Sequence, residues 1–204
     1  MNDDLQTHAE KRPNVDFVTP WLATGGDLHA DPHLAMEDLT RLDEAGVTHI
    51  LDLRVEWTDE AFVAEHAPHI TYVHLGVDDA GQAMPDEWFD AGIALASGVV
   101  ANPEAKLLTH CHMGINRGPS MAYAILLSQG WGVADALDAI RDARPIAGLA
   151  YAPDALAHHH HRTDADEEQT AEDRQALGQW FRRNHIDTAS IIRGIRAAEG
   201  TIYR

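Results

Sequence analysis

The sequence has 204 residues, 45% of them hydrophobic, which suits one domain of usual size plus a short extension and excludes wholesale disorder. Of its net charge of −18, −17 lies on residues 1–157, so this body is expected to repel nucleic acid and anionic membranes. No apolar run approaches the roughly 18 residues of a membrane span, no signal-peptide core stands at the start, and the single cysteine cannot form an internal disulfide. A soluble, cytoplasmic protein is expected, and the oligomeric state stays open.

After a polar N-terminal arm over 1–14, strand and helix patterns alternate. Strands are expected where β-branched and apolar residues cluster, and helices where proline stands at the start and glycine or proline follows the end. The expected strands are 18–24, 47–53, 70–77 and 105–110, and the expected helices are 32–45, 59–66, 85–100, 119–129 and 132–144. This alternation predicts an α/β fold with a central, mostly parallel sheet flanked by helices.

The character of the sequence changes near residue 157. The expected organisation is a main domain over 15–157, a polar histidine-rich linker over 158–170 and a helical extension over 171–204. Trp180 and Phe181 are expected to be buried anchors of the extension. The four consecutive histidines at 158–161 offer imidazoles, but a polar linker does not preform a metal site, so no metal is expected there.

A short segment between a predicted buried strand and an apolar helix carries the chemistry. Backbone N–H groups at such a junction form a cradle for a tetrahedral anion, and Gly114 permits the tight curvature that a cradle needs. Cys111 lies in a field that stabilises a thiolate, and Arg117 offers two parallel N–H donors to phosphate oxygens. These are the parts of covalent phosphoryl transfer. The expected phosphate-binding residues are His112, Met113, Gly114, Ile115, Asn116 and Arg117.

The segment HCHMGINR resembles the signature loop of the protein tyrosine phosphatase superfamily, and its place after several strand and helix units resembles the dual-specificity branch. Four other segments are similar to that branch: WLATGGDL, VTHILDLR, LGVDDAGQAMPDEWF and AIRDARPIAGLAYAPDAL. The resemblance covers about residues 15–157. It implies a phosphatase without cofactor that hydrolyses monoesters of tyrosine, serine or threonine, or small phosphate esters, through a phosphocysteine intermediate.

The resemblance also implies a general acid, because the departing oxygen must be protonated. In the family this is an aspartate about thirty residues before the cysteine, on the loop after a strand. Asp79, 32 positions before Cys111, stands at that place and is preferred over its neighbour Asp78. His110 is implied to organise the loop and help hold the thiolate, although a hydrogen-bonded core histidine would give the same pattern.

One position departs from the family. A serine or threonine usually follows the arginine, and its hydroxyl assists sulfur as the leaving group when the phosphocysteine is hydrolysed. This chain has Gly118 there, with Ser120 two positions later. Slow breakdown of the intermediate is therefore expected, unless Ser120 or a water substitutes.

Other functions remain open. The GINR run also resembles the loop of metal-independent RNA 5′-triphosphatases of this fold, a function that Asp79 and the acidic charge disfavour. A catalytically weak phosphate-binding pseudophosphatase is supported by Gly118 alone. Phosphoinositide phosphatases usually carry lysines in the loop, and this loop has none. Rhodanese and arsenate reductase chemistry also use a cysteine in an anion loop, but the upstream aspartate and the closing segment favour a phosphatase.

Overall fold

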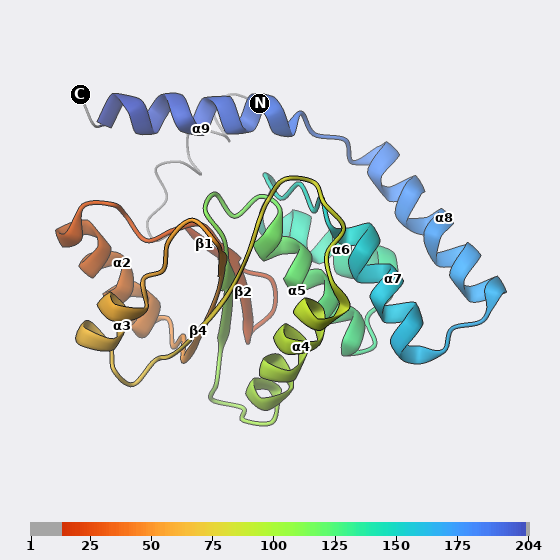
Figure 1. Ribbon diagram of the computed structural model, residues 1–204, viewed down its shortest axis with the longest axis horizontal. Coiled ribbons are helices and arrows are strands. Elements are labelled where there is room, and N and C mark those ends of the chain that lie inside the picture. The colour runs from red at the N-terminus through yellow and green to blue at the C-terminus, as the bar shows by residue number, and fades with distance from the viewer. Residues whose placement is uncertain (1–13, 203–204) are drawn as a thin grey trace.

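A five-stranded sheet in the order β1-β2-β5-β3-β4 forms the centre of the molecule (Figure 1). The structure is a computed structural model that describes residues 14–202, so nearly all of the predicted arm over 1–14 lies outside the described residues. The strands are β1 (Val15–Phe17), β2 (Leu22–Gly25), β3 (His49–Arg54), β4 (Thr71–Val77) and β5 (Leu107–His110). Among them β1 alone runs antiparallel to its neighbour, and all other pairs are parallel. The predicted α/β fold with a mostly parallel sheet is confirmed.

Helices cover both faces of this sheet (Figure 1). One face carries α2 (Pro32–Glu44) and α3 (Glu60–His66), and the other carries α4 (Asp86–Val100), α5 (Arg117–Ser128), α6 (Val133–Ala143) and α7 (Ala152–Thr163). The chain ends with α8 (Glu167–Arg183) and α9 (Thr188–Ile202). Consecutive residues of a strand point to opposite faces. Accordingly Ile50 and Leu108 join the apolar cluster of α2 and α3, whereas Leu51 and Leu107 join the cluster of the other helices.

The boundaries of α2 show how local sequence sets a helix. The Asp31 carboxylate accepts hydrogen bonds from the backbone N–H groups of His33 and Leu34, which caps the helix N-terminus. Pro32 suits the first helical position because its missing N–H would have no partner there. Gly46 follows the helix with a φ of 82°, a conformation that glycine adopts without strain.

The predicted polar linker over 158–170 is wrong at both ends, because residues 158–163 continue α7 and residues 167–170 begin α8. Buried histidines hold α7 in place: His158 Nε2 lies 3.0 Å from Asp90 Oδ1 of α4, and His160 Nε2 lies 2.8 Å from Asp173 Oδ2 of α8. Composition suggested a solvated segment. These rings instead pack between helices, since each finds a carboxylate on a neighbouring helix.

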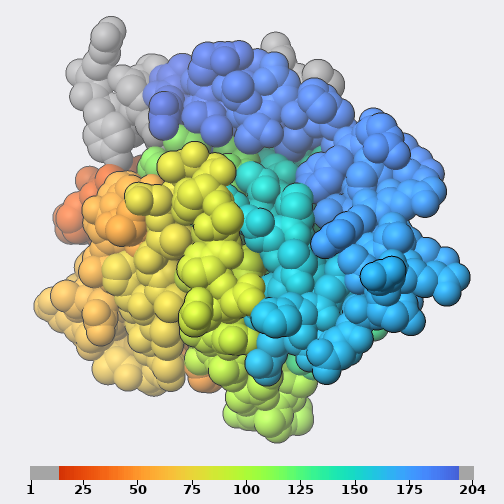
Figure 2. Space-filling view, turned by 45° about the vertical axis from the view of Figure 1, so that its right-hand side comes forward, coloured from red at the N-terminus to blue at the C-terminus, as the bar shows by residue number. Residues whose placement is uncertain are grey.

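The two C-terminal helices pack on the domain in different ways. Trp180 of α8 is buried, as predicted, and its indole N–H donates to Asp138 of α6 at 2.5 Å. Ile191 of α9 joins an apolar cluster with residues of the 111–116 loop. Figures 1 and 2 show α9 lying across the top of the molecule. Within residues 14–202, none of the helices combines the length and apolar character needed to cross a membrane.

Candidate active site

The loop over 111–116 joins the central strand β5 to the N-terminus of α5, where free backbone N–H groups accumulate. Cys111 is 2% exposed, and its N–H donates to the Gly25 carbonyl at 3.2 Å. Gly114 has a φ of 63°, and a Cβ there would lie 2.5 Å from the Gly25 carbonyl carbon. No larger side chain fits, so the tight curvature predicted at Gly114 is confirmed.

Arg144, directly after α6, braces the loop from behind. Its fully buried guanidinium donates from Nε to the Gly114 carbonyl at 2.6 Å and from Nη2 to the Met113 carbonyl at 2.9 Å. The same group pairs with Asp16 at 2.8 Å and with the Asn14 amide oxygen at 2.9 Å. Because C=O and N–H of a peptide point in opposite directions, carbonyls turned to Arg144 leave the following N–H groups facing the cradle.

Replacing Arg144 by methionine is expected to lower the free energy of unfolding by about 3–5 kcal/mol, because the buried Asp16 carboxylate loses its ion pair with Arg144 and two loop carbonyls lose a donor. Urea unfolding followed by circular dichroism measures the change. Arg141→Met is the matched control, since Arg141 of α6 donates to the Asn184 carbonyl without a buried ion pair. Equal losses in the two variants would contradict the bracing role.

Arg117, the first residue of α5, is held by one edge of its guanidinium. Its two Nη groups donate to the Glu56 carboxylate at 2.9 and 2.7 Å, and Nη1 also donates to the Val77 carbonyl at 2.8 Å. Nε is buried without a partner among the described residues and lies 3.8 Å from an Asp79 oxygen. Burial alone would lower the pKa of Arg117, but the hydrogen bonds that it donates to Glu56 raise the pKa above its ordinary value. The guanidinium is therefore fixed and charged, with its Nε edge left for an anion.

Sequence reasoning missed Glu56. The residue follows β3, whose carboxyl end lies beside that of β5. Side chains that follow neighbouring parallel strands meet at the same edge of a sheet, so an acidic residue just after β3 was a usable signal. The hydrogen bond from Arg117 holds the pKa of Glu56 below its ordinary value, which keeps the carboxylate charged as a clamp for the guanidinium.

The structure brings Asp79, rather than Asp78, to the loop. The Tyr151 hydroxyl donates to Asp79 Oδ1 at 2.7 Å, and the Asn116 amide nitrogen lies 3.4 Å from each carboxylate oxygen. Together with the Arg117 Nε contact, these bonds place the Asp79 carboxylate over the loop. The Asp78 side chain has no such contact among the described residues, and only its backbone carbonyl accepts a hydrogen bond, from Gln82.

The side chains of two predicted phosphate-binding residues are buried, so that only their backbone N–H groups remain for the predicted role. The side chains of Met113 and Ile115 are buried in an apolar cluster with Ile146 and with Ile191 of α9. Ile115 also accepts hydrogen bonds at its carbonyl from the backbone of residues 148 and 149. The loop is thereby fixed on the side away from the cradle, so its shape does not depend on a bound anion.

Arg54, to which sequence reasoning assigned no role, is the centre of a buried charge network beside the loop. Its guanidinium pairs with Asp52 at 2.8 Å, with Asp59 at 2.7 Å and with Asp27 at 2.9 Å. Asp27 in turn contacts the His112 ring at 2.6 Å, and its backbone N–H donates to the His112 carbonyl. Burial raises the pKa of Asp27 to about 6, against the lowering by His112 and Arg54. Arg54 thus orients His112 through Asp27.

His110 ends β5 behind the loop and is 3% exposed. Its Nε2 lies 3.6 Å from Asp52 Oδ1, and Nδ1 has no partner among the described residues. Burial lowers the pKa of His110 to about 4, so the ring is neutral at physiological pH. Its place at the strand end suits the predicted role of organising the loop.

This lowered pKa predicts a pH-dependent stability. As the pH falls below the ordinary value of 6.5, the unfolded chain protonates His110 while the folded chain stays neutral down to about 4, so stability is lost on acidification. Between pH ~7 and ~5 the lowered pKa of His110 should reduce the free energy of unfolding by about 2 kcal/mol. Urea unfolding should show that this part of the pH slope is missing in His110→Gln. Asp27, with its raised pKa, opposes the slope in both proteins and cancels from the difference. Parallel slopes would contradict the assignment.

Ser120 lies close to the loop but is already engaged, since its hydroxyl accepts a hydrogen bond from the Tyr151 backbone at 3.2 Å. At Gly118 a Cβ would lie 3.0 Å from the Thr109 carbonyl oxygen and 3.1 Å from Thr24 Oγ1. A serine at this position therefore needs its neighbours to shift by a few tenths of an ångström. Slow breakdown of a covalent intermediate stays a prediction.

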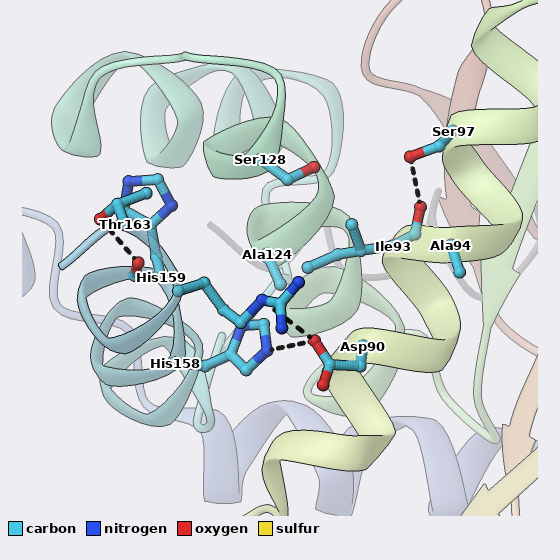
Figure 3. A pocket seen from close by; sticks show the side chains of 10 residues that line it. Asp90, Ile93, Ala94, Ser97, Ala124, Ser128, His158, His159 and Thr163 are labelled. Carbon is cyan, nitrogen blue, oxygen red and sulfur yellow. Dashed lines mark hydrogen bonds and ion pairs between the residues drawn. The ribbon is translucent and has the colours of Figure 1, made fainter.

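A separate cavity of about 550 Å³ lies between α4, α5 and α7, away from the loop (Figure 3). Asp90 stands at its wall and contacts both His158 and Arg162. Its lining residues are Asp90, Ile93, Ala94, Ser97, Ala124, Ser128, His158, His159, Arg162 and Thr163. None of the predicted site residues lines it. Within residues 14–202, no cluster of three His, Cys, Asp or Glu side chains is arranged to hold a metal ion.

Several solved structures share the fold of this chain. Human DUSP28 matches with a TM-score of 0.60 and 19% identity, over 74% of this chain and 98% of that chain. A mouse putative dual specificity phosphatase complexed with zinc tungstate gives a TM-score of 0.62 and 18% identity, over 76% and 91% of the two chains. PTPMT1 in complex with PI(5)P gives 0.60 and 15%, over 74% and 97%. At these identities the likeness establishes the fold.

The family comes from the sequence match. Residues 31–150 match the family model that is described as "Dual specificity phosphatase, catalytic domain". The matched range contains the signature loop, Asp79, Glu56 and Arg144, and it ends just before Tyr151. The chain belongs to the dual-specificity phosphatase family.

Proposed function

We propose that the protein is a cysteine-dependent phosphatase that hydrolyses phosphate monoesters through a phosphocysteine intermediate. One observation carries the proposal: Glu56 holds the Arg117 guanidinium, while its Nε has no hydrogen-bond partner among the described residues and lies 3.8 Å from Asp79, at the end of the loop that begins with Cys111. A hydrogen-bond donor for an anion, an acid and a nucleophile are thus the three parts proposed to act together at the N-terminus of α5.

The reaction proceeds in two steps. The Cys111 thiolate attacks phosphorus, the S–P bond forms, the P–O bond to the leaving group breaks, and Asp79 gives its proton to the departing oxygen. Water then attacks the phosphocysteine, Asp79 takes a proton from that water, the S–P bond breaks, and inorganic phosphate leaves with the thiolate restored. Arg117 and the loop amides hold the equatorial phosphate oxygens in both steps.

The substrate is proposed to be a monoester of a protein side chain or of a small molecule. Acidic side chains contact the loop and Arg117: Glu56 and Asp79 lie at Arg117, and Asp27 lies at His112, while the loop itself carries no lysine. Polyanions such as an RNA triphosphate end are disfavoured in such a field. A catalytically weak phosphate-binding module is the second candidate, supported by Gly118.

The test is p-nitrophenyl phosphate hydrolysis in EDTA, combined with rapid denaturation and peptide mass spectrometry. Release of p-nitrophenol, together with a phosphoryl adduct on the peptide that contains Cys111, is the expected result. Hydrolysis that EDTA abolishes, or an adduct on another residue, would refute the mechanism. Binding of inorganic phosphate with no turnover would favour the second candidate.

A further inference from the structure

Asp79 is held by a residue from a distant part of the chain. Tyr151, which precedes α7, is 2% exposed, and its hydroxyl donates a hydrogen bond to Asp79 Oδ1, with 2.7 Å between the two oxygens. The same hydroxyl oxygen accepts the N–H of Gly81 at 3.2 Å. One phenol thus binds both the carboxylate and the backbone of the segment over 78–85 that carries it, which we call the acid loop.

A second contact ties the acid loop to α7. Asp154, in the first turn of α7, accepts the Met84 backbone N–H at 3.3 Å. The acid loop is therefore fastened at Gly81 and again at Met84, both times by side chains at the start of α7. Its conformation depends on where that helix begins.

The start of α7 is itself fixed to the phosphate-binding loop. The backbone N–H groups of Gly148 and Leu149 donate to the Ile115 carbonyl at 2.7 and 3.2 Å, and the Tyr151 N–H donates to the Ser120 hydroxyl at 3.2 Å. These hydrogen bonds fix the position of Tyr151 relative to α5 and to the loop before it. Distances from the phosphate cradle to Asp79 are set through this short path.

The backbone of this path is strained. Leu149 has a φ of 57°, a left-handed conformation that a residue with a side chain rarely adopts. Leu149 is fully buried and makes the turn that brings Tyr151 beneath the acid loop. Strain of this kind persists where surrounding contacts over-determine it, and it concentrates at functional sites.

We infer that Tyr151 is a positioning residue that holds Asp79 in line with the leaving-group oxygen. The inference rests on the proposed function, since it concerns the acid of that reaction. Its signature follows from the chemistry: p-nitrophenolate departs readily without a proton, whereas the phenolate of phenyl phosphate depends on one. Loss of the clamp should therefore affect phenyl phosphate far more than p-nitrophenyl phosphate.

The experiment compares Tyr151→Phe with the wild-type protein on both substrates. kcat/KM for phenyl phosphate is expected to fall about tenfold, and that for p-nitrophenyl phosphate less than about threefold. In an Asp79→Asn background the Tyr151→Phe change should add less than about twofold, because the acid it positions is gone. Tyr123→Phe is the matched control: Tyr123 is a buried tyrosine of α5 whose hydroxyl has no partner among the described residues.

Each outcome decides something. Equal losses on the two substrates, or a full effect in the Asp79→Asn background, would overturn the positioning role while leaving the phosphatase function intact. No effect of Tyr151→Phe on either substrate would overturn it as well. If wild-type protein hydrolyses neither substrate, the proposed function itself fails. Thermal unfolding of each variant separates a lost fold from a misplaced acid.

Discussion

Cys111→Ser is expected to lower p-nitrophenyl phosphate hydrolysis by at least about 10³-fold, in EDTA and at every pH where the wild-type protein is active. A serine hydroxyl is not ionised in the field that stabilises a thiolate, and the attack on phosphorus needs the anion. Steady-state release of p-nitrophenol at saturating substrate measures the loss.

The folded state of Cys111→Ser should remain intact, because the substituted atom is small and its loop is held by Arg144, Gly25 and α9. Thermal unfolding and binding of inorganic phosphate are the controls, and both should stay close to the wild-type values. A variant that keeps more than about a tenth of the activity would refute nucleophilic catalysis by Cys111.

Arg117→Lys is expected to lower kcat for the same substrate by about 10²–10³-fold, although the positive charge is kept. The guanidinium uses one edge for Glu56 and leaves the edge with Nε for the phosphate, whereas an ammonium is a point charge that cannot do both with fixed geometry. Stopped-flow and steady-state assays of p-nitrophenyl phosphate give kcat and KM separately.

The matched control is Arg141→Lys on α6, whose guanidinium lies 4.8 Å over the Trp180 ring, outside the active-site loop. That variant should keep its wild-type kcat. If Arg117→Lys raises KM and leaves kcat unchanged, the arginine contributes to ground-state binding only, and its assignment to the transition state is wrong.

The fold was predictable because its signals are local. Alternating strand and helix patterns, Pro32 before a helix and Gly46 after it, and the apolar helix behind the loop all depend on nearby residues. The same holds for the loop, since strand, glycine and arginine occur within one short segment. The linker error has the opposite cause. His158 and His160 are polar by composition, but carboxylates on α4 and α8 make their burial favourable, and those partners are remote in sequence.

The unpredicted part of the site consists of residues whose partners are far apart in the chain. Glu56 reaches Arg117 across 61 positions, and Tyr151 reaches Asp79 across 72. Arg144 reaches Asp16 across 128 positions. Such pairings depend on strand order and on where each helix starts, which one sequence does not reveal. Arg54 is a different case, because Asp52 and Asp59 are only 2 and 5 positions away and Asp27 is 27 positions away. Its burial beside the loop depends on the neighbouring strands and is therefore not visible in the local sequence.

The contact between α9 and the loop has a consequence for the order of folding. Ile115 and Ile191 share one apolar cluster although 76 positions separate them. During synthesis from the N-terminus, the sheet, the loop and α5 can assemble while Met113 and Ile115 still lack their covering helix. The contact between Ile115 and Ile191 closes a long stretch of chain, which costs conformational entropy, so this contact is expected to form late in folding. Until α9 is complete, the nascent protein therefore exposes an apolar patch beside Cys111, and during that interval it is most prone to aggregation.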